Sequence, residues 1–118
     1  MGQIRTYRDL IAWQKAMELT RQLYLATEGM PPDERFGLTM QMRRAAVSIP
    51  SNIAEGYARQ SRPDYTRFLK IARGSLAELS TQIEIATTLG FLTPPQELHE
   101  LLAETDRVLQ GLIRSLTR

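Results

Sequence analysis

The side chains in this sequence that could do chemistry are mostly arginines, and they gather in the middle of the chain. Residues 35–75 contain eight basic and two acidic side chains, whereas residues 1–34 contain four and five, and residues 76–118 contain three and six. Thirteen of the fifteen basic residues are arginines, whose planar guanidinium suits carboxylates and phosphates. The middle block therefore predicts contact with an anionic partner or with an acidic surface of the same protein.

A protein surface that neutralises the phosphates of a nucleic acid needs cations at intervals along it, and seven of these basic residues have such a spacing in the sequence. They are Arg43, Arg44, Arg59, Arg62, Arg67, Lys70 and Arg73. The ones expected to be least engaged by other side chains are Arg62, Arg67, Lys70 and Arg73. No aromatic-rich segment accompanies them, so stacking on unpaired bases is not expected. Two interpretations stay open: the cations bind RNA or DNA, or they form a solvated face with ion pairs between subunits to the acidic last third of the chain.

The sequence contains few residues whose side chains could catalyse a reaction or bind a metal ion. It has no cysteine, and its one histidine lacks the glutamate three residues earlier that the ferritin-like metal motif requires. Glu55 and Glu78 could suggest acid–base catalysis. We expect instead that they pair with Arg44, Arg59 or Asn52. Because glycine-rich phosphate loops and serine nucleophile motifs are also missing, we expect no enzyme activity, no cofactor and no metal.

Hydrophobic spacing and capping residues predict four helices that would carry these side chains. The helices span about residues 6–29, 33–60, 61–90 and 93–116. Caps are expected at Thr6, Ser61 and Thr93. The core face predicted for the first helix comprises Leu10, Trp13, Met17, Thr20 and Tyr24. Since no segment alternates with a period of two and the connections are short, we expect an all-α, up-down-up-down antiparallel four-helix bundle that forms a single domain over residues 1–118.

The second predicted helix carries a proline in its interior. Pro50 cannot donate to the carbonyl four residues earlier, so the helix should be kinked there or break and restart. The hydroxyls of Ser48 and Ser51 can serve backbone groups left unpaired, and Gly56 allows close backbone contact. Strained packing and a binding notch both stay open as explanations.

Two further faces of the same helix separate on a helical wheel. One is a polar stripe with both signs of charge: Gln41, Arg44, Ser48, Asn52, Glu55 and Arg59. The other, here called the outer apolar stripe, comprises Met40, Val47, Ala54 and Ala58. A monomeric bundle would carry lysine and glutamate at such positions, so the outer apolar stripe predicts an interface with another copy of the chain.

The segment from Gln41 to Gly56, QMRRAAVSIPSNIAEG, resembles the signature of the four-helix-bundle proteins encoded in intervening sequences of bacterial 23S ribosomal RNA genes. This segment contains Ser48, Pro50, Ser51, Asn52, Glu55 and Gly56. The resemblance extends over about residues 7–114 and implies a homopentamer of four-helix protomers. The accessory proteins of diversity-generating retroelements are similar, which implies RNA, DNA or a reverse transcriptase as partners.

The first ten residues, MGQIRTYRDL, lack the apolar core of a signal peptide, and no apolar run in the sequence could span a membrane. We therefore expect a cytoplasmic protein with no membrane partner. In sum, the sequence predicts a non-enzymatic homo-oligomer that binds nucleic acid or a nucleic-acid-processing partner. The alternative is a protein-binding scaffold with no nucleic-acid role.

Overall fold

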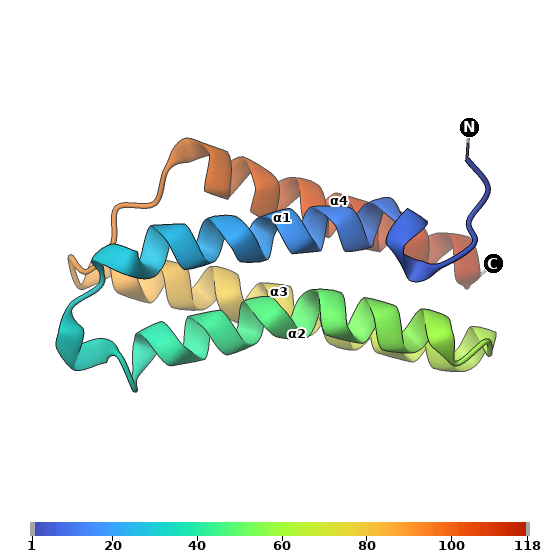
Figure 1. Ribbon diagram of the computed structural model, residues 1–118, viewed down its shortest axis with the longest axis horizontal. Helices are drawn as coiled ribbons and strands as arrows, with labels where there is room; N and C mark the ends of the chain where they lie inside the picture. The colour runs from blue at the N-terminus through green and yellow to red at the C-terminus, as the bar shows by residue number, and fades with distance from the viewer. Residues whose placement is uncertain (1, 118) are drawn as a thin grey trace.

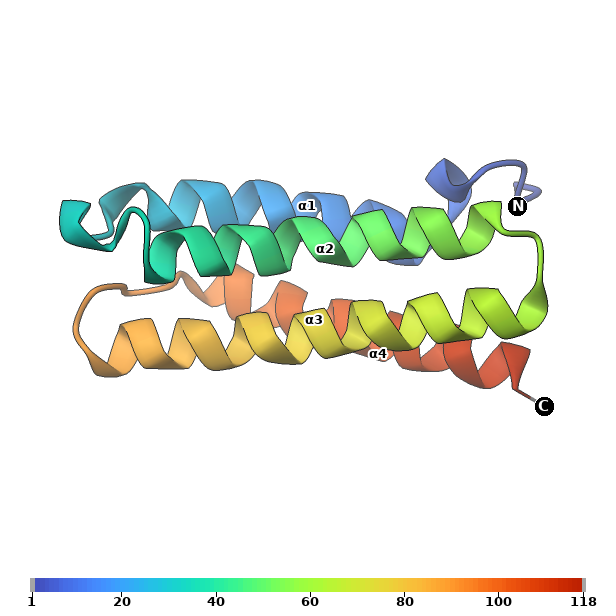
Figure 2. The same cartoon turned by 90° about the horizontal axis from the view of Figure 1, so that it is seen from below.

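Four antiparallel helices run along the long axis of the molecule (Figures 1 and 2). In the computed structural model, which describes residues 2–117, the helices are α1 (Ile11–Ala26), α2 (Leu38–Ala58), α3 (Arg62–Thr88) and α4 (Gln96–Leu116). Helices α1 and α3 each pack on both α2 and α4, and the most extensive contact joins α2 to α3. Residues 2–117 contain no strand. The predicted all-α, up-down-up-down bundle is confirmed.

A continuous apolar cluster from all four helices forms the core. Its largest fully buried apolar side chains are Leu19, Leu23, Met42, Ile49, Ile53, Leu69, Leu79, Ile83, Leu98 and Leu109. Full burial of one such side chain contributes about 1.5–3 kcal/mol, so this cluster is the main source of stability. The polar Thr105 is also buried, and its hydroxyl donates to the carbonyl of Leu101 at 2.7 Å.

The face of α1 that enters the core differs from the predicted one. Met17 is 45% exposed and Tyr24 is 41% exposed, although both were expected inside. The buried residues of the helix are Ala12, Ala16, Leu19 and Leu23. The two alanines let α1 approach its neighbours closely, while Leu19 and Leu23 fill the core. The prediction was wrong for Met17 and Tyr24, because the spacing of apolar residues fits two adjacent faces of the helix, whereas Leu10 is buried as expected.

Helix boundaries at the loops also depart from the predicted ones. The Thr6 capping box is present, but it closes a 3-10 turn at Tyr7–Asp9, and α1 begins only after an extended Leu10. Another 3-10 turn follows α1 at Thr27–Gly29, and a third, at Pro32–Glu34, takes the place of the predicted first turn of α2. Helix α4 starts at Gln96 without a side-chain cap, so the cap predicted at Thr93 is wrong.

Helix α3 begins and ends as its sequence predicts. The Ser61 hydroxyl accepts the backbone N–H of Asp64 at 3.4 Å, which satisfies one of the free donors of the first turn. Gly90, just beyond the helix, has a φ of 76°, a left-handed conformation that favours glycine.

Helix α2 continues through Pro50 without a break, so the alternative of a break and restart is wrong. A bend within the continuous helix stays a prediction. The carbonyl of Ala46, which loses its N–H partner, lies 3.3 Å from the hydroxyl of Thr20 on α1, and that hydroxyl also donates to the Ala16 carbonyl at 2.8 Å. The single hydroxyl proton of Thr20 is therefore shared between two carbonyls, and the longer contact compensates in part for the missing N–H of Pro50.

Neither serine that was expected to serve the unpaired backbone does so. Ser51 donates its hydroxyl to the carbonyl of Val47 at 2.8 Å. The Ser48 hydroxyl lies 2.8 Å from the hydroxyl of Ser75 on α3. Ser48 thus connects α2 to α3 and leaves the carbonyl of Ala46 to Thr20.

The predicted close contact at Gly56 is confirmed. A Cβ atom at this position would lie 2.6 Å from the Cβ of Phe68 and 3.3 Å from the carbonyl oxygen of Tyr65. Both neighbours belong to α3, and neither is the far end of a side chain that could move aside. The spacing of α2 and α3 at this level therefore requires glycine.

A double-mutant cycle tests the compensation at Pro50. Thr20→Val should lower the free energy of unfolding by about 1–3 kcal/mol, because it leaves the buried Ala46 carbonyl without a donor. In the Pro50→Ala background the new N–H of residue 50 reaches this carbonyl, so Thr20→Val should cost less than half as much. Urea unfolding of the four proteins measures the difference. Effects that add within about 0.5 kcal/mol would show that Thr20 and Pro50 are independent.

Gly56→Ala tests the close packing of α2 on α3. Overpacking should cost about 1–3 kcal/mol, more than the gain of about 1 kcal/mol in helix propensity. Gly74→Ala is the matched control, because a Cβ at Gly74 meets nothing within 4 Å in the middle of α3. Thermal unfolding should show Gly56→Ala less stable and Gly74→Ala more stable than the wild type. Equal gains in both variants would contradict the packing argument.

Candidate nucleic-acid interface

The bundle divides the seven predicted nucleic-acid-binding cations into two groups. Arg43 and Arg44 lie in the first half of α2. The other five lie around the α2–α3 turn and along the first half of α3: Arg59, Arg62, Arg67, Lys70 and Arg73. The first half of α2, which carries Arg43 and Arg44, lies toward the opposite end of the bundle from the α2–α3 turn (Figure 2). The seven side chains do not form one surface.

Arg43 uses its donors within the fold. Its Nε donates to Thr27 Oγ1 at 3.0 Å and its Nη2 to the carbonyl of Tyr24 at 3.3 Å. The guanidinium also lies 4.5 Å from the centroid of the Tyr24 ring. Arg43 thus joins α2 to the end of α1. Its neighbour Arg44 is exposed and has no ion-pair partner among residues 2–117.

Two arginines at the α2–α3 turn lie on the ring of Phe68. The guanidinium carbon of Arg59 is 5.0 Å from the ring centroid, and that of Arg67 is 4.6 Å from it. Arg59 also pairs with Glu55 at 3.0 Å, as predicted, and Arg67 with Asp64 at 3.7 Å. Contact with an aromatic ring restricts where a guanidinium can point, so both cations are held in place at the turn.

The remaining cations of α3 differ in how far they are engaged. Arg62 donates from Nη1 to the carbonyl of Leu116 at 3.4 Å. Arg73 donates from Nε to Asp106 Oδ1 at 2.8 Å, and this contact lowers the pKa of the Asp106 carboxyl. Lys70 is exposed and has no ion-pair partner among the residues that the structure describes. The expectation that Arg67 and Arg73 are among the cations least engaged by other side chains is therefore wrong.

The polar residues of the family-like segment mostly connect α2 to itself and to α3. Asn52 donates from Nδ2 to the carbonyl of Ser48 at 2.8 Å and to its hydroxyl at 2.9 Å.

The acidic residue Glu78, on α3, does not have the partner predicted for it. Glu78 accepts from Gln82 Nε2 at 3.2 Å, so its predicted pairing with Arg44, Arg59 or Asn52 is wrong. Over residues 2–117 there is no cluster of three histidine, cysteine or acidic side chains that could hold a metal ion.

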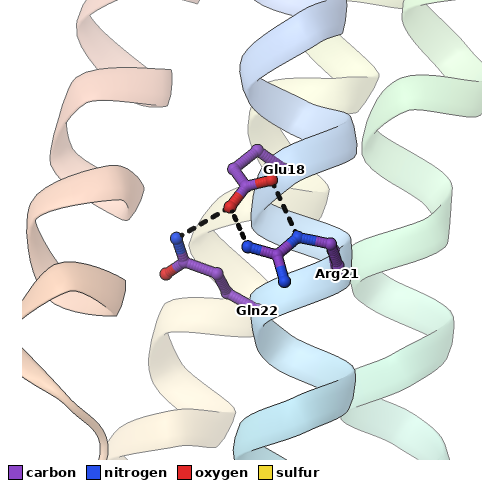
Figure 3. Close-up of polar contacts among 3 residues, drawn as sticks. All are labelled: Glu18, Arg21 and Gln22. Atoms are coloured by element: carbon purple, nitrogen blue, oxygen red, sulfur yellow. Dashed lines mark hydrogen bonds and ion pairs between the residues drawn. The ribbon is translucent and has the colours of Figure 1, made fainter.

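An ion pair on α1 was not singled out in the sequence. Figure 3 shows Glu18 with Arg21 and Gln22. Arg21 donates to both carboxylate oxygens at 2.9 and 2.5 Å, and Gln22 donates at 3.1 Å. These hydrogen bonds lower the pKa of Glu18 to about 2. The spacing of three residues could have predicted the pair. Its consequence is that Arg21 is neutralised locally and adds little to any anion-binding surface.

The outer apolar stripe lies largely on the surface. Met40 is 37% exposed and Val47 is 42% exposed, while Ala58 is exposed and Ala54 half-buried. Tyr24 on α1 is also exposed, and its ring contacts the guanidinium of Arg43 on α2. The sequence did not predict this contact, because Tyr24 was expected in the core.

A groove of about 820 Å³ runs between α3 and α4. Apolar side chains such as Leu76, Ile83 and Leu102 line it, and the paired Arg73 and Asp106 lie in its wall.

None of the helices in residues 2–117 is both long enough and apolar enough to cross a lipid bilayer.

Comparisons with known proteins agree with this architecture. The family profile described as 23S rRNA-intervening sequence protein matches residues 8–114. A crystal structure of a protein of unknown function from the S23 ribosomal protein family of Bacteroides thetaiotaomicron has a TM-score of 0.78 with this fold, at 24% sequence identity, and the alignment covers 88% of this chain and 96% of that one. No curated protein matches the sequence. Because the profile spans nearly all of the chain, this protein belongs to the family of 23S rRNA-intervening sequence proteins.

Proposed function

We propose that this protein is a non-enzymatic homo-oligomer that binds nucleic acid, or a partner that processes nucleic acid such as a reverse transcriptase, through its basic surface. The observation that carries the proposal is the group of exposed arginines at the α2–α3 turn, two of them held on the Phe68 ring. Guanidinium groups bind phosphate oxygens with paired donors, and electrostatic binding of this kind needs no pocket. In this proposal the protein requires no cofactor and catalyses no reaction.

Assembly would proceed through the outer apolar stripe. Exposed Met40 and Val47 leave apolar area in water, and the small Ala54 and Ala58 allow a second helix to approach closely. Burial of apolar area contributes about 25 cal/mol per Å², so a contact along several turns of α2 would favour association. The family resemblance supports five subunits, and closed rings are common among soluble homo-oligomers.

The outer apolar stripe also favours a second candidate function. A protein-binding scaffold with no nucleic-acid role would use the same exposed apolar side chains to hold a different protein. The two functions differ in their response to salt. Phosphate contacts weaken steeply with ionic strength, whereas apolar contacts do not.

Ala54→Glu tests the assembly. A carboxylate placed in a packed interface costs several kcal/mol of desolvation, so this variant should be a monomer of about 13.5 kDa, while the wild type should have about five times that mass. Ala77→Glu, at an exposed position of α3, is the control and should keep the wild-type mass. Light scattering coupled to gel filtration gives both masses. A wild-type protein of 13.5 kDa at micromolar concentration would contradict the proposal.

Charge reversal tests the nucleic-acid contact. Arg62→Glu combined with Arg67→Glu should weaken binding of single-stranded RNA and duplex DNA alike, with unchanged helicity. Fluorescence anisotropy at several salt concentrations is the measurement, and wild-type binding should fall steeply as salt rises.

Two results would separate the candidate functions. Absence of wild-type binding to both nucleic acids at low salt, up to about 100 µM protein, would remove the nucleic-acid role. Capture of a protein partner that persists at high salt, in the same preparation, would then establish the scaffold.

A further inference from the structure

The charges of this protein separate along the long axis of the bundle. The basic end consists of residues 2–10, 59–67 and 110–117, and it carries six basic and two acidic side chains. The acidic end consists of residues 27–37 and 84–100, and it carries six acidic side chains and one basic. Both chain termini and the α2–α3 turn lie at the basic end, and the other two connections lie at the acidic end (Figures 1 and 2). At each end, segments that are distant in sequence therefore come together and form a region of one net sign of charge.

The two ends act on a charged ligand independently. The molecule is 43 Å long, whereas the Debye length at physiological ionic strength is about 8 Å. Each end also contains the N-termini of two long helices and the C-termini of the other two, so the helix dipoles largely cancel. The side-chain charges therefore set the field at each end.

Most cations of the basic end are available to a ligand. Arg5, Arg8, Arg62 and Arg114 have no carboxylate partner among the residues described here, 2–117. Arg59 and Arg67 have such partners in Glu55 and Asp64, but both remain about half exposed on their side chains and are oriented by the Phe68 ring. Such a guanidinium can bind a phosphate oxygen and stay in contact with the Phe68 ring.

We propose that the basic end is the part of the molecule that contacts the phosphate backbone of the nucleic acid. This inference rests on the proposed function and deepens it in two ways. It adds Arg5, Arg8 and Arg114, which lie outside the arginine-rich block of the sequence. It also removes four cations from the contact surface. Arg43 and Arg44 lie nearer the acidic end, and Arg43 is bonded to α1. Lys70 and Arg73 lie further along α3 than the basic end extends, and Arg73 is paired with Asp106.

The proposal limits how strongly binding can depend on salt. Six cations neutralise at most six phosphates per protomer, so the slope of log K against log salt should not exceed about 5 in magnitude on duplex DNA and about 4 on a single strand. The acidic end should repel the backbone, so the nucleic acid would bind at one end of the bundle only.

Two charge-matched double variants test the location. Arg8→Glu with Arg114→Glu removes charge at the basic end, and Arg35→Glu with Arg44→Glu removes the same charge elsewhere. The probes are a labelled single-stranded RNA and a labelled duplex DNA of equal length. The first variant should lose at least about tenfold in affinity at low salt, and its salt slope on duplex should fall by about 2. The second variant should bind within about twofold of the wild type.

The outcomes separate this inference from the proposed function. A wild type that binds neither probe overturns both. A wild type that binds, with equal losses in both variants or a larger loss in Arg35→Glu with Arg44→Glu, leaves nucleic-acid binding in place and overturns the basic end as its site. Helicity and mass are measured for each variant. If a double variant changes mass, the single variants Arg8→Glu and Arg35→Glu repeat the comparison, with the same expected order of affinities.

Discussion

The absence of a side chain at Gly56 lets α2 and α3 pack so closely that any Cβ would overlap Phe68. This contact fixes the position of the Phe68 ring at the turn between the two helices. The ring then orients the guanidinium groups of Arg59 and Arg67, which come from opposite sides of the turn. A backbone constraint inside the bundle thus orients two of the six cations of the basic end. The proposed binding function depends on that arrangement.

Periodicity predicted those parts of the fold that depend on local sequence. Helix α4 is a clear case: Leu98, Leu102, Thr105 and Leu109 follow one another at spacings of four, three and four residues, which is typical of one buried helix face, and all four are buried. The face of α1 could not be read in the same way, because alanines face the core and a large residue such as Tyr24 lies at the edge. Only the packing of neighbouring helices decides between two such faces.

The residue types of the candidate site could be predicted from the sequence, but most contacts between residues on different helices could not. The pair of Glu55 and Arg59 follows from a spacing of four residues, and it is present. Arg73 pairs with Asp106 from a different helix, and the carbonyl that Pro50 leaves unpaired is approached by Thr20 on α1. Both partners are distant in sequence, so no local pattern identifies them. For the same reason the arginine-rich block of residues 35–75 looks like one surface in the sequence but spans both ends of the bundle.

The central claim is that nucleic acid contacts the end of the bundle that carries the chain termini and the α2–α3 turn. Photo-cross-linking of wild-type protein to a photoreactive RNA, followed by mass spectrometry of the linked peptides, tests it most directly. The account predicts cross-links in residues 2–10, 59–67 and 110–117, which decrease as salt is raised. Cross-links concentrated in residues 27–37 and 84–100, or spread evenly over the whole chain, would contradict it.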